Sequence, residues 1–119
     1  MKLGLAGIFL IALAAPASAY MSGEGHEYRL TCNANGYSLK SVNPVGRFIG
    51  HGAGTQIKSE RETLALGRSC DAHVKAFGYG EWCWANGGFF ATFPGGKIEF
   101  PRQELFCEPE PEYELNCRC

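Results

Sequence analysis

Six cysteines constrain the fold of this 119-residue chain more than any other feature. An even number of cysteines in a short chain that leaves the cytoplasm predicts a disulfide framework, which compensates for a small core. Six cysteines allow many pairings, and the sequence does not choose among them. The predicted disulfide residues are Cys32, Cys70, Cys83, Cys107, Cys117 and Cys119.

The spacing of the last two cysteines limits which disulfides they can form. Cys117 and Cys119 are separated by a single residue, which disfavours a bond between them, so they are predicted to reach two different partners. We expect Cys32 to pair with one of the two. Such a bond would join the first strand of the domain to the last.

The first nineteen residues are predicted to be a cleavable signal peptide. Met1-Lys2 supplies a positive start, residues 3–15 form an apolar run, and Pro16-Ala17-Ser18-Ala19 ends in small residues. The apolar run is shorter than the roughly 18 residues of a membrane span. Cleavage after Ala19 would leave one domain over residues 20–119, in the periplasm or secreted, with no membrane anchor. A retained N-terminal anchor is the alternative.

Short stretches of alternating apolar residues, separated by glycine-rich turns, predict an all-β domain. The fold class expected is a small antiparallel β-barrel or sandwich of six to eight short strands, stapled by disulfides. Asn35-Gly36 and Pro94-Gly95-Gly96 are predicted hairpin turns, residues 50–54 a flexible loop, and residues 70–79 a loop with one helical turn. Strands are expected over residues 27–32, 37–42, 48–49, 62–66, 81–85, 89–93, 97–100, 105–107 and 113–119.

The charge distribution excludes one class of partner. The chain carries 11 Lys and Arg against 12 Asp and Glu, so it lacks the basic surplus typical of nucleic-acid binding. Residues 108–114 alternate Glu with other residues, and this acidic connection is interpreted as a solvated edge. Its functional alternative is electrostatic attraction to a basic exported protein.

Cys70-Asp71-Ala72-His73 places a thiol, a carboxylate and an imidazole within four residues. A free Cys70 beside His73 could act as a nucleophile with its base. The two could also ligate a metal together with Cys117 and Cys119. Both interpretations require reduced sulfur, whereas an oxidising compartment favours a structural disulfide. We therefore expect no catalytic residue, no metal and no cofactor. The enzyme alternative uses Asp71, His73 and Glu81 as an acid–base set.

Trp82 and Trp84 lie on one face of the strand expected over residues 81–85. Large aromatic side chains dominate small cores, so we interpret both as core residues. The alternative is that their two planes, about 7 Å apart, stack on the sugar rings of a carbohydrate.

Three segments resemble, in order, the small periplasmic inhibitors of C-type lysozyme. They are residues 28–32 (Tyr-Arg-Leu-Thr-Cys) with Asn35-Gly36, residues 66–72 (Leu-Gly-Arg-Ser-Cys-Asp-Ala), and residues 84–87 (Trp-Ala-Asn-Gly). The resemblance implies an antiparallel β-barrel that inserts a loop into the active-site cleft of a lysozyme. Ser69 stands at the family's loop serine, and Asn86 stands where the family has a lysine. A different exported family of similar layout is the alternative.

The functional hypothesis from the sequence is therefore an exported binding module. Its candidate contact residues are Ser69, Asp71 and His73, together with Asn86. The expected partner is a basic exported protein or a cell-wall saccharide, and the specific form of the hypothesis is an inhibitor of a cell-wall hydrolase such as lysozyme. The alternatives are an envelope enzyme, a carbohydrate-binding domain, and a structural envelope protein without a discrete site.

Overall fold

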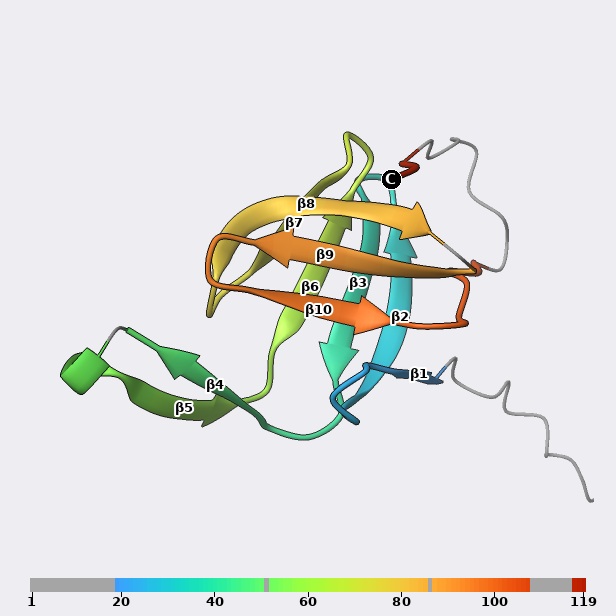
Figure 1. Ribbon diagram of the computed structural model, residues 1–119. Coiled ribbons are helices and arrows are strands. Elements are labelled where there is room, and N and C mark those ends of the chain that lie inside the picture. Colours follow the sequence, from blue (N-terminus) through green and yellow to red (C-terminus); the bar gives the residue numbers. More distant parts are fainter. Residues whose placement is uncertain (1–18, 51, 86, 108–116) are drawn as a thin grey trace, which may run out of the picture.

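The computed structural model describes residues 19–50, 52–85, 87–107 and 117–119. Eight strands form one antiparallel sheet that curls into a nearly closed barrel, and two more form a separate hairpin (Figure 1). This confirms the predicted all-β class. The order in the barrel is β1 (Ala19–Met21), β2 (Glu27–Asn33), β3 (Gly36–Ser41), β6 (Thr63–Gly67), β7 (Asp71–Val74), β8 (Gly78–Ala85), β9 (Gly88–Phe93) and β10 (Gly96–Phe100).

The separate hairpin consists of β4 (Val45–Ile49) and β5 (Gln56–Glu60), joined through a single 3₁₀ turn at Gly52–Gly54. It inserts between β3 and β6 and projects from one end of the barrel (Figure 1). In the part of the chain that the structure describes, no helix is long and apolar enough to cross a membrane.

Most predicted strands are found, and the β9–β10 hairpin is confirmed, although its turn is shorter than expected because Gly96 already pairs with Phe93. The predicted loop over residues 70–79 is wrong, because β7 begins at Asp71 and β8 begins at Gly78. In β7, Ala72 and Val74 are buried, whereas Asp71 and His73 point outward. Its apolar residues are small and few, so the strand lacks a strong alternating signal and depends on pairing with β6 and β8.

The C-terminal strands expected from the sequence differ from the observed structure. Residues 105–107 form no strand, and residues 113–116 of the last predicted strand lie outside the described residues. At the end of the chain, Arg118 forms a parallel bridge with Trp84 of β8. The Trp84 N–H donates to the Cys117 carbonyl over 2.6 Å, and the Cys119 N–H donates to the Trp84 carbonyl over 3.0 Å.

The first hairpin turns one residue earlier than expected. Asn33 pairs with Gly36, so Ala34 and Asn35 form the turn and Gly36 begins β3. Gly36 has a φ of 136°, and a Cβ at this position would collide with the Leu66 carbonyl oxygen of β6. Glycine is therefore required here both for its backbone conformation and for the close approach of the two strands.

Aromatic rings fill the barrel. Trp82 is 1% exposed and its indole N–H donates to the Gly67 carbonyl over 2.8 Å, so the core interpretation is confirmed for this residue. The rings of Phe89 and Phe100 stack with centroids 4.7 Å apart, and Tyr28 packs edge-on against Phe100. Rings of this size bury much apolar area per residue, which suits a domain of about 100 residues.

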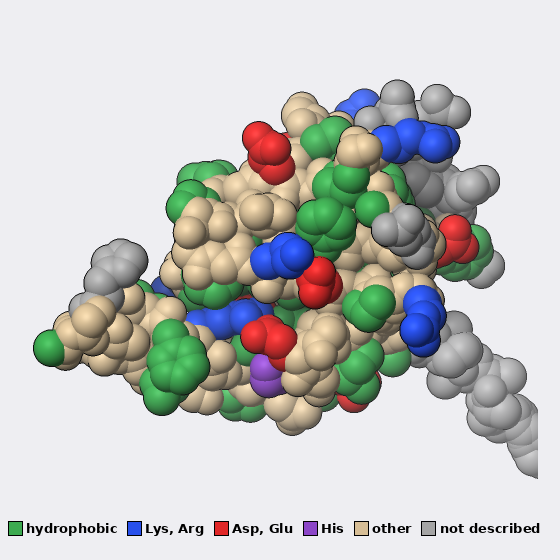
Figure 2. Space-filling model, in the orientation of Figure 1, with side chains coloured by type: hydrophobic (Ala, Val, Ile, Leu, Met, Phe, Trp, Pro, Cys, Tyr) green, Lys and Arg blue, Asp and Glu red, His purple; other side chains and the backbone are tan. Residues whose placement is uncertain are grey.

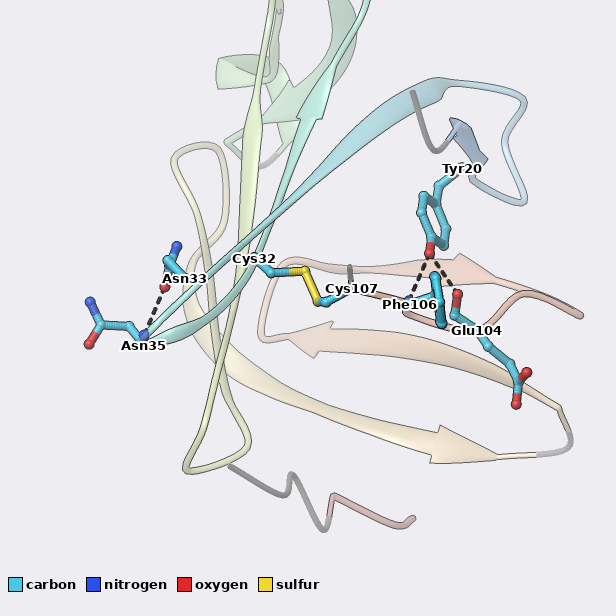
Figure 3. Close-up of a disulfide and its surroundings, with 7 residues drawn as sticks. All are labelled: Tyr20, Cys32, Asn33, Asn35, Glu104, Phe106 and Cys107. Carbon is cyan, nitrogen blue, oxygen red and sulfur yellow. Dashed lines mark hydrogen bonds between the residues drawn. A yellow bond between two sulfur atoms is a disulfide. The ribbon is translucent and has the colours of Figure 1, made fainter. Parts of the chain in front are cut away.

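The three disulfides use all six cysteines. Cys117 and Cys119 bond to Cys70 and Cys83, which confirms that they reach different partners. The expected bond between Cys32 and one of these two is wrong, because Cys32 bonds to Cys107 (Figure 3). The chain after β10 passes β2 before it reaches β8, so Cys107 arrives at Cys32 first. Three disulfides indicate an oxidising environment outside the cytoplasm.

The edges β1 and β10 are joined through the segment that follows β10. The Gln103 side-chain amide pairs with the backbone of Met21, accepting from its N–H over 2.8 Å and donating to its carbonyl over 2.7 Å. The Tyr20 hydroxyl donates to the Glu104 carbonyl and accepts from the Phe106 N–H (Figure 3). Side chains thus satisfy edge groups that a further strand would otherwise pair.

We predict that Gln103→Ala lowers the free energy of unfolding by about 1–2 kcal/mol, because two hydrogen bonds to the β1 edge are lost. Urea denaturation measures this change. The matched control is Glu104→Ala, whose exposed side chain makes no contribution to the closure, so its effect is expected to stay within about 0.5 kcal/mol. Equal stability of the two variants would show that Gln103 does not hold the edge.

Candidate functional site

A polar groove of about 750 Å³ lies on the outer face of the barrel, over β3, β6 and β7. It brings together side chains from four strands, since Asn33 ends β2, and from two turns, and most of them carry hydrogen-bonding groups. Sequence reasoning identified Ser69, Asp71 and His73, and all three line this groove. The polar groove is also lined by Asn33, Asn35, Tyr37, Ser38 and Arg68.

Ser69 lies in the tight turn between β6 and β7. The Cys70 N–H donates to the Gly67 carbonyl over 3.1 Å, which closes this turn. Cys70 has a φ of 67°, a conformation that residues other than glycine rarely adopt. Its disulfide with Cys117 ties the strained residue to the C-terminal segment. The loop that carries Ser69 is therefore tied covalently to the C-terminal segment at its base.

Asp71 and His73 lie two residues apart on β7, so both project into the groove. The Asp71 carboxylate lies directly over Gly67, where any Cβ would collide with it. The His73 ring lies 4.6 Å from the ring of Tyr79, its cross-strand partner on β8. Because Tyr79 is 76% exposed, an open aromatic ring stands beside the polar groups.

The remaining residues that were selected from the sequence do not all line the polar groove. Asn86 lies outside the described residues. Glu81 is the cross-strand partner of Asp71, so two members of the proposed acid–base set are neighbours on the outer face. The thiol that a nucleophile or a metal site would need is consumed by the Cys70–Cys117 disulfide. Among the described residues, no three His, Cys, Asp or Glu side chains gather as metal ligands.

The two tryptophans do not form a stacking platform. Trp82 is buried, and Trp84 is partly buried between the rings of Trp82 and Phe89, at 5.6 and 5.7 Å. Both rings pack against the core rather than standing free for a sugar. Aromatic stacking on the outer face would instead fall to Tyr79, which the sequence analysis did not select.

The β4–β5 hairpin is a second candidate surface, and the sequence analysis missed it. Phe48 and Ile57 are cross-strand partners on its outer face, with exposures of 71% and 66%. Figure 2 shows hydrophobic side chains on this projecting part of the molecule. Both residues resemble core residues in the sequence, and the signal that could have marked the hairpin is their position on either side of a glycine-rich turn.

A buried ion pair anchors the base of the hairpin. The Arg47 guanidinium contacts both oxygens of Glu62, at 2.6 and 3.0 Å, and lies 5.3 Å over the ring of Phe77. The Tyr28 hydroxyl donates to the same carboxylate. Arg47 also reaches Glu24 over 2.9 Å. Because Arg47 and Glu62 are both buried, this network sets the direction in which the hairpin leaves the barrel.

Burial, reinforced by the hydrogen bond to Glu62, raises the pKa of the Tyr28 phenol above its ordinary value. Burial alone would disfavour the Arg47 cation, but its hydrogen bonds to Glu62 outweigh this effect and hold the pKa of Arg47 above the ordinary value. Arg47 and Glu62 therefore form a charged pair with a neutral phenol beside it.

Comparisons with known protein families, curated proteins and solved structures found no match to this chain.

We predict that alkaline pH destabilises the fold partly through Tyr28. Below about pH 10 the phenol is protonated in both states; above it, the unfolded chain releases a proton that the folded chain retains. This group thus reduces the free energy of unfolding by up to about 1.4 kcal/mol per pH unit above pH 10. Tyr28→Phe should show a shallower decline in urea denaturation between pH 9 and 11.

Two comparisons complete this test. At pH 8, Tyr28→Phe should already be about 1–3 kcal/mol less stable, because a buried carboxylate loses a hydrogen bond. The control Tyr79→Phe removes an exposed hydroxyl and should leave the stability at pH 8 close to that of the wild type. If Tyr28→Phe and the wild type declined in parallel, Tyr28 would not retain its proton in the folded state.

Proposed function

We propose that the protein is an exported binding module that presents the polar groove to its ligand. The proposal for export is supported by the N-terminal pattern of residues 1–19 and by three disulfides. Cleavage after Ala19 would leave Tyr20 at the N-terminus, where its buried ring packs in the barrel. The mature chain would then keep the side chain that holds β1 to the segment after β10.

The polar groove is proposed as the binding surface because of one observation. Ser69, Asp71 and His73 gather in one concave site, and the Cys70–Cys117 disulfide holds the turn beside them. A preformed site loses little conformational entropy when a ligand binds, so more of the free energy of its hydrogen bonds contributes to the affinity. Ser69, Asp71 and His73 can bind a ligand without a free cysteine, whereas a cysteine nucleophile would need the Cys70 thiol that forms the disulfide.

The proposed ligand is a saccharide of the cell envelope. Its hydroxyl groups would match the Asp71 carboxylate and the side-chain amides and hydroxyls along β2, β3 and the turn between them, because these groups donate or accept hydrogen bonds. The exposed Tyr79 ring beside His73 offers an apolar face against which a sugar ring can pack. This combination of a ring with planar polar groups favours a saccharide over an apolar ligand.

We expect titration calorimetry with soluble peptidoglycan fragments to detect binding that weakens roughly tenfold or more in Asp71→Asn, because hydrogen bonds to a charged group contribute about 1.5–3 kcal/mol. Tyr79→Ala and Ser69→Arg, which remove the ring and obstruct the groove, should also weaken binding. Glu99→Gln on β10 is the control of equal charge change. Equal affinity of Asp71→Asn and the wild type would remove the polar groove from the proposal.

A second candidate is inhibition of a cell-wall hydrolase such as lysozyme, and the projecting hairpin favours it. A narrow convex element with an exposed apolar pair suits a concave active-site cleft, whereas the groove itself cannot enter one. The buried Arg47–Glu62 pair holds this element in one direction, which lowers the entropic cost of insertion. Phe48 and Ile57 would be the anchoring side chains.

The inhibitor hypothesis is tested by measuring lysozyme activity with and without the purified protein at micromolar concentration. Slowing that is abolished in the double variant Phe48→Ser/Ile57→Ser, but kept in Ser69→Arg, would assign inhibition to the hairpin. The reverse pattern would assign it to the Ser69 turn. No slowing by the wild-type protein would contradict inhibition of lysozyme altogether.

A further inference from the structure

A second, smaller cavity separates the inner face of the β4–β5 hairpin from the barrel. Its volume is about 250 Å³, and it shares no lining residue with the polar groove. Its walls come from β4, β5, the segment after β5 and the turn between β7 and β8. Neither candidate function above uses this space, because the groove lies elsewhere and Phe48 and Ile57 face the opposite side of the hairpin.

Apolar side chains form one wall of this cavity. Val45 is buried, and Ile49 and Ala76 are partly buried along the same wall. Val45, Arg47 and Ile49 alternate along β4, so their side chains share the inner face of the hairpin. The methylene groups of the long basic side chains extend this apolar surface, since such chains bury their stems and keep their charged ends in water.

The opening of the cavity is basic. Lys58, Arg61 and Lys75 all line it, and Figure 2 shows Lys or Arg side chains in the recess beside the hairpin. Lys58 and Arg61 have no ion-pair partner among the described residues. Lys75 pairs with Glu60 over 3.2 Å, but both side chains are exposed, and such pairs contribute little and exchange readily.

The deeper charges of the cavity cancel. Arg47 and Glu62 neutralise each other in their buried pair. Of the remaining lining charges, three are cations and one, Glu60, is a carboxylate. Glu24 contacts Arg47 from outside the lining and lowers the surplus from two positive charges to one. The cavity therefore combines an apolar wall with a cationic opening.

We propose that this cavity binds a small amphiphile with one alkyl chain and an anionic head group. The chain would contact Val45, Ile49 and Ala76, and the head would meet Lys58 and Arg61. The volume lies below the roughly 300–1,000 Å³ of sites for drug-sized ligands, so the site suits a short single chain rather than a two-chain lipid. A carboxylate and a phosphate monoester share the required chemistry, and they represent a free fatty acid and a lipid-derived head group.

The probes are sodium decanoate, decyl phosphate and decyltrimethylammonium, each below its micellar concentration, titrated into ¹⁵N-labelled full-length protein and followed by NMR. Both anions should bind with the largest amide shifts in residues 45–49, 58–62 and 75–76. The cationic probe should bind at least fivefold more weakly. A stronger response to decanoate would favour a fatty acid as the source, and a stronger response to decyl phosphate would favour a lipid head group.

Variants separate the two parts of the site. Lys58→Gln and Arg61→Gln should each weaken decanoate binding by up to about fivefold, the range of exposed charge pairs. Lys97→Gln, on β10, removes a cation elsewhere and should leave the affinity unchanged. Ala76→Trp should block binding by filling the cavity, and the NMR spectrum itself reports whether this variant folds.

Equal binding of the anionic and cationic probes would overturn the proposal. So would shifts confined to the polar groove, or a Lys58→Gln/Arg61→Gln double variant that binds decanoate like the wild type. The proposal is independent of the two candidate functions, because the saccharide and lysozyme experiments use Asp71, Phe48 and Ile57, none of which lines this cavity.

Discussion

The buried pair of Arg47 and Glu62 determines how the molecule is divided into a barrel and a projecting hairpin. Removing two charges from water is costly, and here the cost is offset by bidentate contact, by the Tyr28 hydroxyl and by the ring of Phe77. Because Tyr28 also packs in the aromatic core, the network joins the base of the hairpin directly to the barrel interior. The exposed apolar pair and the cavity behind the hairpin both depend on this junction.

The polar groove and the β4–β5 hairpin are stabilised by different interactions, so different changes are expected to disrupt them. The polar groove depends on strand pairing and on the Cys70–Cys117 disulfide, which fixes the Ser69 turn covalently. The hairpin depends on an ion pair and on hydrogen bonds, which are lost when one partner is replaced. Reduction of the Cys70–Cys117 disulfide would therefore affect the polar groove, whereas substitutions of Arg47 or Glu62 would affect the hairpin and the cavity behind it.

Local patterns predicted the parts of the fold whose signals are local. The β9–β10 hairpin has strong alternation around a Pro-Gly turn. Asp71 and His73 were expected in a loop, whereas they share the outer face of β7. β7 itself was missed, because Ala72 and Val74 are a weak apolar pattern. Tyr79 escaped notice because it meets His73 through cross-strand register, which no spacing along the chain encodes.

Local sequence patterns were sufficient to predict that the domain is all-β, that its six cysteines are oxidised, and that residues 117 and 119 reach separate partners. These properties follow from composition, alternation and short-range geometry. Local patterns did not reveal that Cys32 bonds to Cys107, that Phe48 and Ile57 are exposed, or that Arg47 meets Glu62. Each depends on which distant segments lie side by side, and that arrangement follows from the free energy of the whole packed barrel.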